Sequence, residues 1–220
     1  ATPLYIACQE GHLECAQLLL EASAAVDQAR QNGATPLFIA CAEGHLECAQ
    51  LLRDAGAAVN QAYNDGATPL FMACHEGQLE CVRLLLEAGA AINQARQDGA
   101  TPLSIACRKG HVECARLLLE ASAAVNQAKD DGGTPLFVAC QKGHLECVRL
   151  LLEASAAVNQ AREDGATPLL MASQNGHLEC ARLLLEAGAA VSQAAANGCT
   201  PLYMACKNGH LEVAKLLSSY

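Results

Sequence analysis

Short apolar stripes alternate with polar turns along the whole chain, and each stripe has the spacing of one helical face. Between residues 33 and 65, apolar or small residues recur at i, i+3, i+4 and i+7, which places them on one side of a helix. The first set is Leu37, Ala40, Cys41 and Gly44, and the second is Cys48, Leu51, Leu52 and Ala55. The pattern therefore predicts two short helices separated by a turn.

Capping residues mark where these two helices begin and end. Thr35 followed by Pro36 is typical of a helix N-terminus, because Thr accepts a hydrogen bond from a free backbone N–H and proline has no N–H to lose. Gly44 and Gly56 are predicted to end the first and second helices in a left-handed conformation. Residues 57–65 are then expected to form an extended, turn-like connection.

The same unit recurs through the chain at a period of 33 residues, without insertion or deletion. Thr-Pro-Leu begins at residues 2, 35, 68, 101, 134, 167 and 200. Isolated helices below about 12–15 residues are marginal in water, so each unit must bury its apolar faces on its neighbours. We expect an all-α solenoid forming one array over residues 1–220, with repeats at 1–32, 33–65, 66–98, 99–131, 132–164, 165–197 and 198–220.

This unit resembles the ankyrin repeat over the whole chain. In the third copy the resemblance rests on Thr68-Pro69-Leu70, Gly77, Leu84-Leu85-Leu86, Gly89-Ala90 and Asn93. It implies stacked helix-turn-helix repeats with projecting β-turn fingers, and a concave groove formed by the first helices and the fingers. It also implies binding of other proteins, without enzymatic chemistry. No polar capping repeat precedes Thr2, so we expect the natural chain to continue beyond residue 1, and possible continuation beyond residue 220 is left open.

Composition narrows the classes of partner. A net charge of −9 argues against a general nucleic-acid binder, which would neutralise phosphates with Lys and Arg. No apolar run approaches the ~18 residues needed to cross a bilayer, and no signal peptide opens the chain. We expect an intracellular chain (cytoplasm or nucleus) that is a monomer, does not insert into membranes, and has no small-molecule substrate and no cofactor.

The 13 cysteines follow the repeat, apart from Cys199. Cysteines in one column are expected ~8–10 Å apart, too far for a disulfide, which needs Cα atoms ~4.4–6.8 Å apart. No C-x2-C pair supports a metal site. We interpret both columns as small buried hydrophobes, and Cys199 as the best candidate for an exposed thiol. One column is Cys8, Cys41, Cys74, Cys107, Cys140 and Cys206; the other is Cys15, Cys48, Cys81, Cys114, Cys147 and Cys180.

A histidine recurs where the second helix begins. His12 precedes Cys15 by three residues, a spacing that could indicate a thiolate–imidazole pair. A catalytic site does not need the near-identical copies that follow, whereas a hydrogen bond that braces each turn does. We therefore predict a structural role and no enzyme. The other copies are His45, His111, His144, His177 and His210.

Four columns vary between copies, and the resemblance places them on the first helices and fingers. Exposed second-helix positions such as Glu47 stay constant, which favours a binding groove over random drift. The candidate partner-binding residues are Arg30, Phe38, Glu43, Tyr63, Phe71, His75, Glu76, Arg96, Ser104, Arg108, Lys109, Lys129, Phe137, Gln141, Lys142, Arg162 and Gln174.

Charge along the predicted groove changes sign. Glu43 and Glu76 lie in repeats two and three, whereas Arg108, Lys109 and Lys142 lie in repeats four and five. We predict a protein partner with an acidic segment facing repeats four and five. Aromatic residues often dominate binding energy, so the aromatic candidates are predicted anchors. These are Phe38, Tyr63, Phe71 and Phe137.

Two other functions are compatible with the pattern. The array could be a spacer or elastic solenoid within a larger protein, or an engineered repeat protein without a natural function. One further expectation concerns stability. Ser23, Ser122 and Ser155 stand where other copies have the Gly that ends the second helix, and we expect these serines in a strained left-handed conformation.

Overall fold

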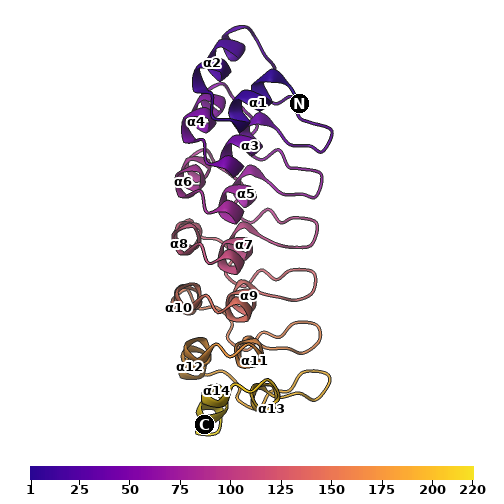
Figure 1. The fold of residues 1–220 in the computed structure, drawn as a ribbon, viewed down its shortest axis with the longest axis vertical. Coiled ribbons are helices and arrows are strands. Elements are labelled where there is room, and N and C mark those ends of the chain that lie inside the picture. The colour runs from indigo at the N-terminus through magenta and orange to yellow at the C-terminus, as the bar shows by residue number, and fades with distance from the viewer. The chain divides into compact units, whose positions relative to one another are not determined.

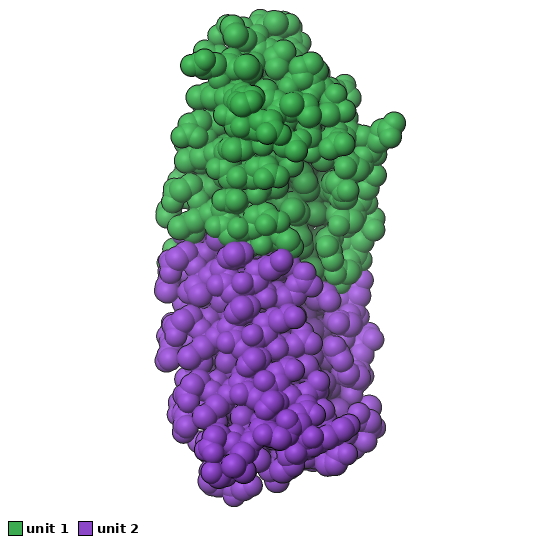
Figure 2. Space-filling model, in the orientation of Figure 1, with its two compact units in different colours: residues 1–102, 120–123 green, residues 103–119, 124–220 purple.

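The computed structural model describes residues 1–220, and its regular secondary structure consists of 14 α-helices. The chain divides into two compact units (Figure 2). Unit 1 comprises residues 1–102 and 120–123, and it contains α1 to α6. Unit 2 comprises residues 103–119 and 124–220, and it contains α7 without its first residue, α8 without its last residue, and α9 to α14.

Each repeat contributes two helices, as the apolar pattern predicts. The first helices are α1 (Pro3–Gln9), α3 (Pro36–Glu43), α5 (Pro69–Glu76), α7 (Pro102–Lys109), α9 (Pro135–Lys142), α11 (Pro168–Gln174) and α13 (Pro201–Lys207). The second helices are α2 (Leu13–Glu21), α4 (Leu46–Asp54), α6 (Leu79–Glu87), α8 (Val112–Glu120), α10 (Leu145–Glu153), α12 (Leu178–Glu186) and α14 (Leu211–Leu217).

The predicted helix boundaries are confirmed. The Thr35 hydroxyl accepts a hydrogen bond from the Phe38 backbone N–H at 3.1 Å, and Pro36 is the first helical residue. Gly44 ends α3 with φ +80°, a conformation that costs glycine no steric strain. The expected left-handed serines are also confirmed. Their φ angles are 64° at Ser23, 68° at Ser122 and 62° at Ser155.

Within each unit, equivalent helices of successive repeats pack on each other. In unit 1, α1 contacts α3 and α3 contacts α5, while α2 contacts α4 and α4 contacts α6. In unit 2, α9, α11 and α13 pack in order, and so do α10, α12 and α14. Figure 1 shows that the connecting fingers project from the side of the first helices that faces away from the second helices.

The core lies between the two helices of each repeat and between neighbouring repeats. The leucine that follows each Thr-Pro is at most 1% exposed in the first six repeats, from Leu4 to Leu169. Backbone hydrogen bonds connect adjacent fingers, for example from Asn64 N–H to Asn32 O at 3.0 Å and from Ala196 N–H to Asp164 O at 2.8 Å. None of the helices is long and apolar enough to span a membrane.

Candidate protein-binding surface

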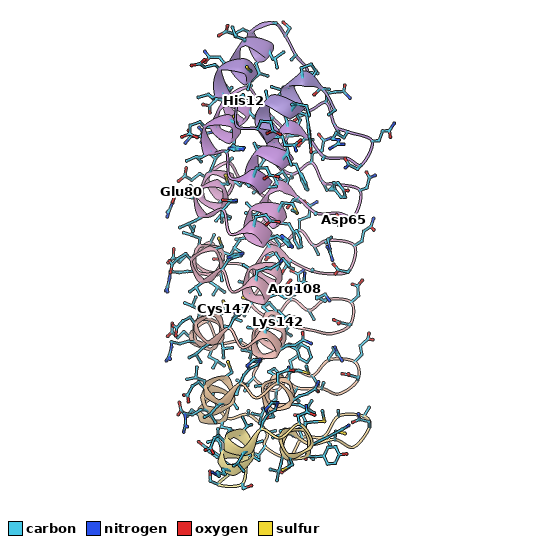
Figure 3. All side chains as sticks on the ribbon, viewed as in Figure 1. His12, Asp65, Glu80, Arg108, Lys142 and Cys147 are labelled. Atoms are coloured by element: carbon cyan, nitrogen blue, oxygen red, sulfur yellow. The ribbon has the colours of Figure 1, made fainter.

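Basic side chains from α7 and α9 border an open hollow in unit 2. Arg108, Lys109 and Lys142 line this hollow together with His144, and its volume is about 410 Å³. Lys109 and Lys142 are exposed, and Arg108 is half-buried. Figure 3 shows Arg108 and Lys142 on the first helices, between the second helices and the fingers. The structure thus brings together the three cations that the sequence placed in repeats four and five.

The helix ends position these cations. Arg108 and Lys109 are the last two residues of α7, and Lys142 is the last residue of α9. Cations are favoured there because the free carbonyl groups give a helix C-terminus partial negative charge. Gly143 then turns the chain out of α9 with φ +76°. The cationic side chains therefore extend at the rim of the repeat, away from its apolar core.

The repeated histidine connects this rim to the next repeat. His144 Nε2 lies 3.1 Å from Arg108 O, to which it donates a hydrogen bond, and His45 bonds Gln9 O in the same way at 3.0 Å. The predicted bracing role is confirmed, and the bond connects neighbouring repeats. A Cβ at Gly110 would lie 2.7 Å from His144 Nδ1, so glycine is required there by space as well as by its φ of +80°.

The finger cations differ from those of the hollow because carboxylates of the fingers pair with them. Arg96 bonds Asp98 through Nη2 at 2.7 Å and lies 3.7 Å from Asp65. Arg162 pairs with Asp164, and the Arg162 hydrogen bond lowers the pKa of that carboxyl. These finger pairs are internal to the chain, so they leave less charge for a partner.

Lys129 is a third finger cation with an internal partner, since its Nζ lies 3.7 Å from Asp131. Arg30, also on a finger, is exposed and lies over the Tyr5 ring with Cζ 5.1 Å from the ring centroid. The cations of the finger column therefore contact neighbouring groups of the same array.

The predicted aromatic anchors are mostly buried, which corrects the sequence-based expectation. Phe71 is 1% exposed, Phe137 2% and Phe38 7%, and Ser104 at the same column is 3% exposed. Such side chains cannot offer much surface to a partner, because neighbouring repeats already cover them. Tyr63 is half-buried and stacks on Phe38, with ring centroids 5.5 Å apart. The phenylalanine side chains therefore pack inside the array and are not part of its exposed surface.

The first-helix column and the finger column vary together. Arg162 lies over the Phe137 ring at 5.2 Å, and Arg96 lies over the Phe71 ring at 5.5 Å. Where the first helix has Leu170 in place of an aromatic residue, the finger has Ala195. The sequence shows how each of the two columns varies. That residues of the two columns are in contact follows only from the structure, in which each finger folds back over the first helix of its own repeat.

The remaining candidates lie in two places. In unit 1, Glu43 and Glu76 are exposed, and Glu76 Oε1 lies 2.6 Å from His75 Nδ1. In unit 2, Gln141 and Gln174 line a second hollow of about 210 Å³, together with Arg162. Of these two hollows, the one lined by Arg108 and Lys142 carries cations that form no salt bridge within the chain.

The cysteines form contacts that sequence reasoning missed. The Cys8 thiol is hydrogen-bonded to the Cys48 thiol of the next repeat, and Cys41 is bonded in the same way to Cys81. The expected spacing concerned cysteines of one column, whereas the close contacts run diagonally, from a first-helix cysteine to the second-helix cysteine of the next repeat. Burial raises the pKa of Cys8 to about 12, so this thiol stays protonated.

Most cysteines are buried, as expected, but the exposed ones are not those predicted. Cys15 and Cys206 are exposed, whereas Cys199 is intermediate. Cys15 lies in α2 of the first repeat and Cys206 in α13 of the seventh. No group of three or more His, Cys, Asp or Glu side chains is arranged to hold a metal ion.

Comparison with known proteins identifies the fold family. The chain matches the family described as ankyrin repeats (3 copies) over residues 1–63, 70–162, 122–195 and 155–220. The chain belongs to the ankyrin repeat family. The human ASB11 ankyrin repeat domain, known from a crystal structure, is similar to this array with a TM-score of 0.90 and 33% identity. The similarity covers 99% of this chain and 98% of that domain. No curated protein sequence matches the chain.

Membership of the family indicates the general kind of function that such an array has. Ankyrin repeats are generally protein-interaction modules, and the ankyrin fold is typically non-enzymatic. Fold alone does not specify a partner, because one scaffold carries many different sites. The residues of this array that differ between repeats must therefore carry any argument about what it binds.

Proposed function

We propose that this ankyrin array binds a protein segment along its first helices, with acidic side chains of the partner facing Arg108, Lys109 and Lys142. One observation carries the proposal. These three cations border a common hollow, and none of the salt bridges in the chain includes any of them. In a chain of net charge −9, an unneutralised cationic cluster is a local exception.

The chemistry of the cluster favours carboxylates within a protein. Arg108 can hold a carboxylate with two parallel hydrogen bonds, while the two lysines add positive charge without fixing its orientation. Exposed pairs of this kind set register and association rate more than they add affinity. We infer that most of the binding affinity comes from apolar and polar contacts elsewhere on the surface, including those around Gln141 and Gln174.

A spacer role is the second candidate, and one observation favours it. Two of the four variable columns pair with each other, as Phe137 does with Arg162, so their variation has a structural cause. Variation in those columns then says nothing about a partner. The proposed function therefore depends on the columns at the C-terminal ends of the first helices, which contain Arg108, Lys109 and Lys142.

Selection from a displayed library of random peptides tests the proposal. The wild-type array is compared with the triple variant Arg108→Glu, Lys109→Glu, Lys142→Glu. The matched control is Arg116→Glu, Arg149→Glu, Arg182→Glu, which makes the same charge change on the second helices, where each arginine has an exposed i,i+3 partner. Such exposed pairs contribute only ~0–1 kcal/mol, so the control should fold.

We expect Asp- and Glu-rich peptides to be enriched by wild type and by the control, and not by the first-helix variant. The Kd for a selected peptide should weaken about tenfold or more in that variant, which corresponds to at least ~1.4 kcal/mol, and binding should weaken with added salt. Equal binding by all three arrays, or no acidic enrichment, would favour the spacer role.

A further inference from the structure

Repeat six lacks a contact that repeats one, two, three and five make with their own side chains. In each of those repeats a long finger side chain lies over an aromatic ring of the first helix, as Arg162 lies 5.2 Å from the centroid of the Phe137 ring. In repeat six the corresponding residues are Leu170 on α11 and Ala195 on the finger. Since the alanine side chain is a single methyl group, it cannot cover the first helix as arginine does.

A hollow of about 210 Å³ lies where this contact is missing. Leu170 and Ala195 both line the hollow, and Arg162 of the preceding finger lines it from the other side of the repeat. Repeat six is internal, because α9 and α13 both pack on α11. The hollow is therefore a consequence of the two small side chains of repeat six, and it lies between repeats that are present on both sides.

The charge of this hollow is balanced. Arg162 is the cation that lines it, and the Asp164 carboxylate accepts a hydrogen bond from Arg162 Nε at 3.1 Å. At the place of Asp164 the next finger has the neutral Asn197, which also lines the hollow. A charged side chain would lose water here without gaining a free opposite charge, so the hollow favours a neutral occupant.

Two glutamine side chains at the hollow make no hydrogen bond within the chain. Gln141 and Gln174 lie at the C-terminal ends of α9 and α11, and both line the hollow. The bonds that fix these residues use their backbone carbonyl groups. Gln141 O accepts from Asn175 Nδ2 at 3.2 Å, and Gln174 O accepts from Asn208 Nδ2 at 2.7 Å. The two side-chain amides are therefore available to a hydroxyl group of a ligand, as donor or as acceptor.

We propose that this hollow binds a tyrosine side chain of the partner protein, in the place that a finger side chain occupies in other repeats. The array itself contains a model of the contact, because Tyr63 lies over Phe38 with ring centroids 5.5 Å apart. A tyrosine ring can pack on Leu170 and stack on the Arg162 guanidinium, while its hydroxyl reaches the glutamine amides. The inference rests on the proposed function, since it names the residue that anchors the acidic segment.

The cationic hollow and the tyrosine hollow are adjacent, which predicts a feature of the partner's sequence. Lys142, which lines the cationic hollow, directly follows Gln141 on α9. Successive first helices lie ~10 Å apart and an extended chain advances ~3.3 Å per residue, so about three residues connect the two places. We expect acidic residues about three positions from the tyrosine. Acidic side chains then face the cations, and the neutral ring faces the hollow whose charge is balanced.

The first test fills the hollow with a side chain that the array already uses. Ala195→Arg gives repeat six the finger arginine of repeats one, three and five, so the variant should fold and cover Leu170. Ala196→Arg is the matched control. Ala196 is the next residue of the same finger, is exposed, does not line the hollow and stands where the other fingers have polar side chains. Both variants add one positive charge at neighbouring places, so a difference between them reports the hollow.

A displayed library of random peptides is selected against wild type, against both finger variants and against the triple glutamate variant of the cationic cluster. Wild type and Ala196→Arg should enrich peptides with tyrosine about three positions from acidic residues. Ala195→Arg should retain the acidic residues and lose the tyrosine, whereas the triple variant should lose the acidic residues and retain the tyrosine. Acidic peptides without tyrosine from wild type would overturn this inference and leave the proposed function standing. Tyrosine peptides without acidic residues would support the tyrosine site and overturn the acidic partner.

The affinity of one selected peptide then locates its tyrosine. Alanine in place of that tyrosine should weaken the Kd for wild type about tenfold or more, as expected of an aromatic anchor. Phenylalanine there should give a Kd in between, because it retains the ring and loses the hydroxyl. With Ala195→Arg, the tyrosine and alanine peptides should bind equally, because the hollow is already filled. A tenfold difference that persists in Ala195→Arg would show that the tyrosine binds elsewhere and would overturn the inference.

Discussion

The Arg162 guanidinium lies over the Phe137 ring, with Cζ 5.2 Å from the ring centroid. Phe137 is on α9 and is 2% exposed, while Arg162 is on the finger that follows in the same repeat. The pair connects the finger to the first helix, and the Asp164 carboxylate accepts hydrogen bonds from the same guanidinium. The orientation of the finger thus depends on a side chain of the core.

Coupling between these two residues is the first prediction. Repeat six has the natural pair Leu170 and Ala195 at the same places, so Phe137→Leu with Arg162→Ala reproduces a combination that the chain already uses. We expect a coupling free energy of ~0.5–1 kcal/mol from urea unfolding of the two single variants and the double variant, the size of an exposed cation–π contact. Lys129 and Ser104 hold the equivalent places in repeat four, where the first helix has no aromatic ring. Lys129→Ala and Ser104→Ala should therefore show no such coupling, and equal coupling there would rule out the ring as the cause.

The left-handed serines predict simple stabilising substitutions. Ser122 and Ser155 have φ angles of 68° and 62°, where a side chain is strained and glycine is not. Ser122→Gly and Ser155→Gly should each stabilise the array by about 0.5–1 kcal/mol, the left-handed penalty less the greater unfolded-state freedom of glycine. Thermal unfolding should show a higher midpoint for each variant. The reverse change Gly188→Ser, where a Cβ meets no atom within 4 Å, should lower it.

The bond from His144 to Arg108 O predicts that glutamine can replace histidine. In repeat three Gln78 occupies this place, and its Nε2 donates to Ala42 O at 3.4 Å. His144→Ala removes the donor and should destabilise by about 1 kcal/mol, because a net hydrogen bond contributes ~0.5–1.5 kcal/mol. His144→Gln should recover most of that loss in the same denaturation assay. If Gln were as destabilising as Ala, packing of the ring over Gly110 would be the dominant contribution.

Alkaline pH should destabilise the array through its buried thiols. Burial raises the pKa of Cys114 and of Cys180 from 9.0 to about 11, and that of Cys8 to about 12. An unfolded thiol ionises near pH 9 and a buried one does not, so the stabilisation is complete below pH 9 and is lost as pH rises toward 11–12. The free energy of unfolding, measured by urea between pH 7.5 and 10.5, should fall with pH.

A variant separates the thiols from tyrosine and lysine, which also titrate in that range. Cys114→Ala with Cys180→Ala should reduce the slope of stability against pH, although it lowers stability at neutral pH by removing buried sulfur. An unchanged slope would mean that these two cysteines do not contribute to the alkaline loss.

The sequence by itself determined the features that depend on the local backbone. Thr35 caps α3, Gly44 ends it and Ser155 is left-handed because capping and φ preferences act within a few residues. The apolar period determined the helices, and the 33-residue repeat determined that they stack. Of the candidate surface, the cluster of Arg108, Lys109 and Lys142 could be predicted because all three extend from the ends of helices whose faces were already assigned.

Only the tertiary structure decided which side chains a neighbouring repeat covers. Phe71 and Phe137 were predicted as anchors, since an aromatic residue next to a helix N-terminus has the same local sequence whether or not a finger packs on it. The pairing of Cys8 with Cys48 and of Arg162 with Phe137 likewise depends on the offset between repeats. That offset depends on how the helices pack against each other. The sequence period gives the length of a repeat, but it does not give the direction in which one repeat is displaced relative to the next.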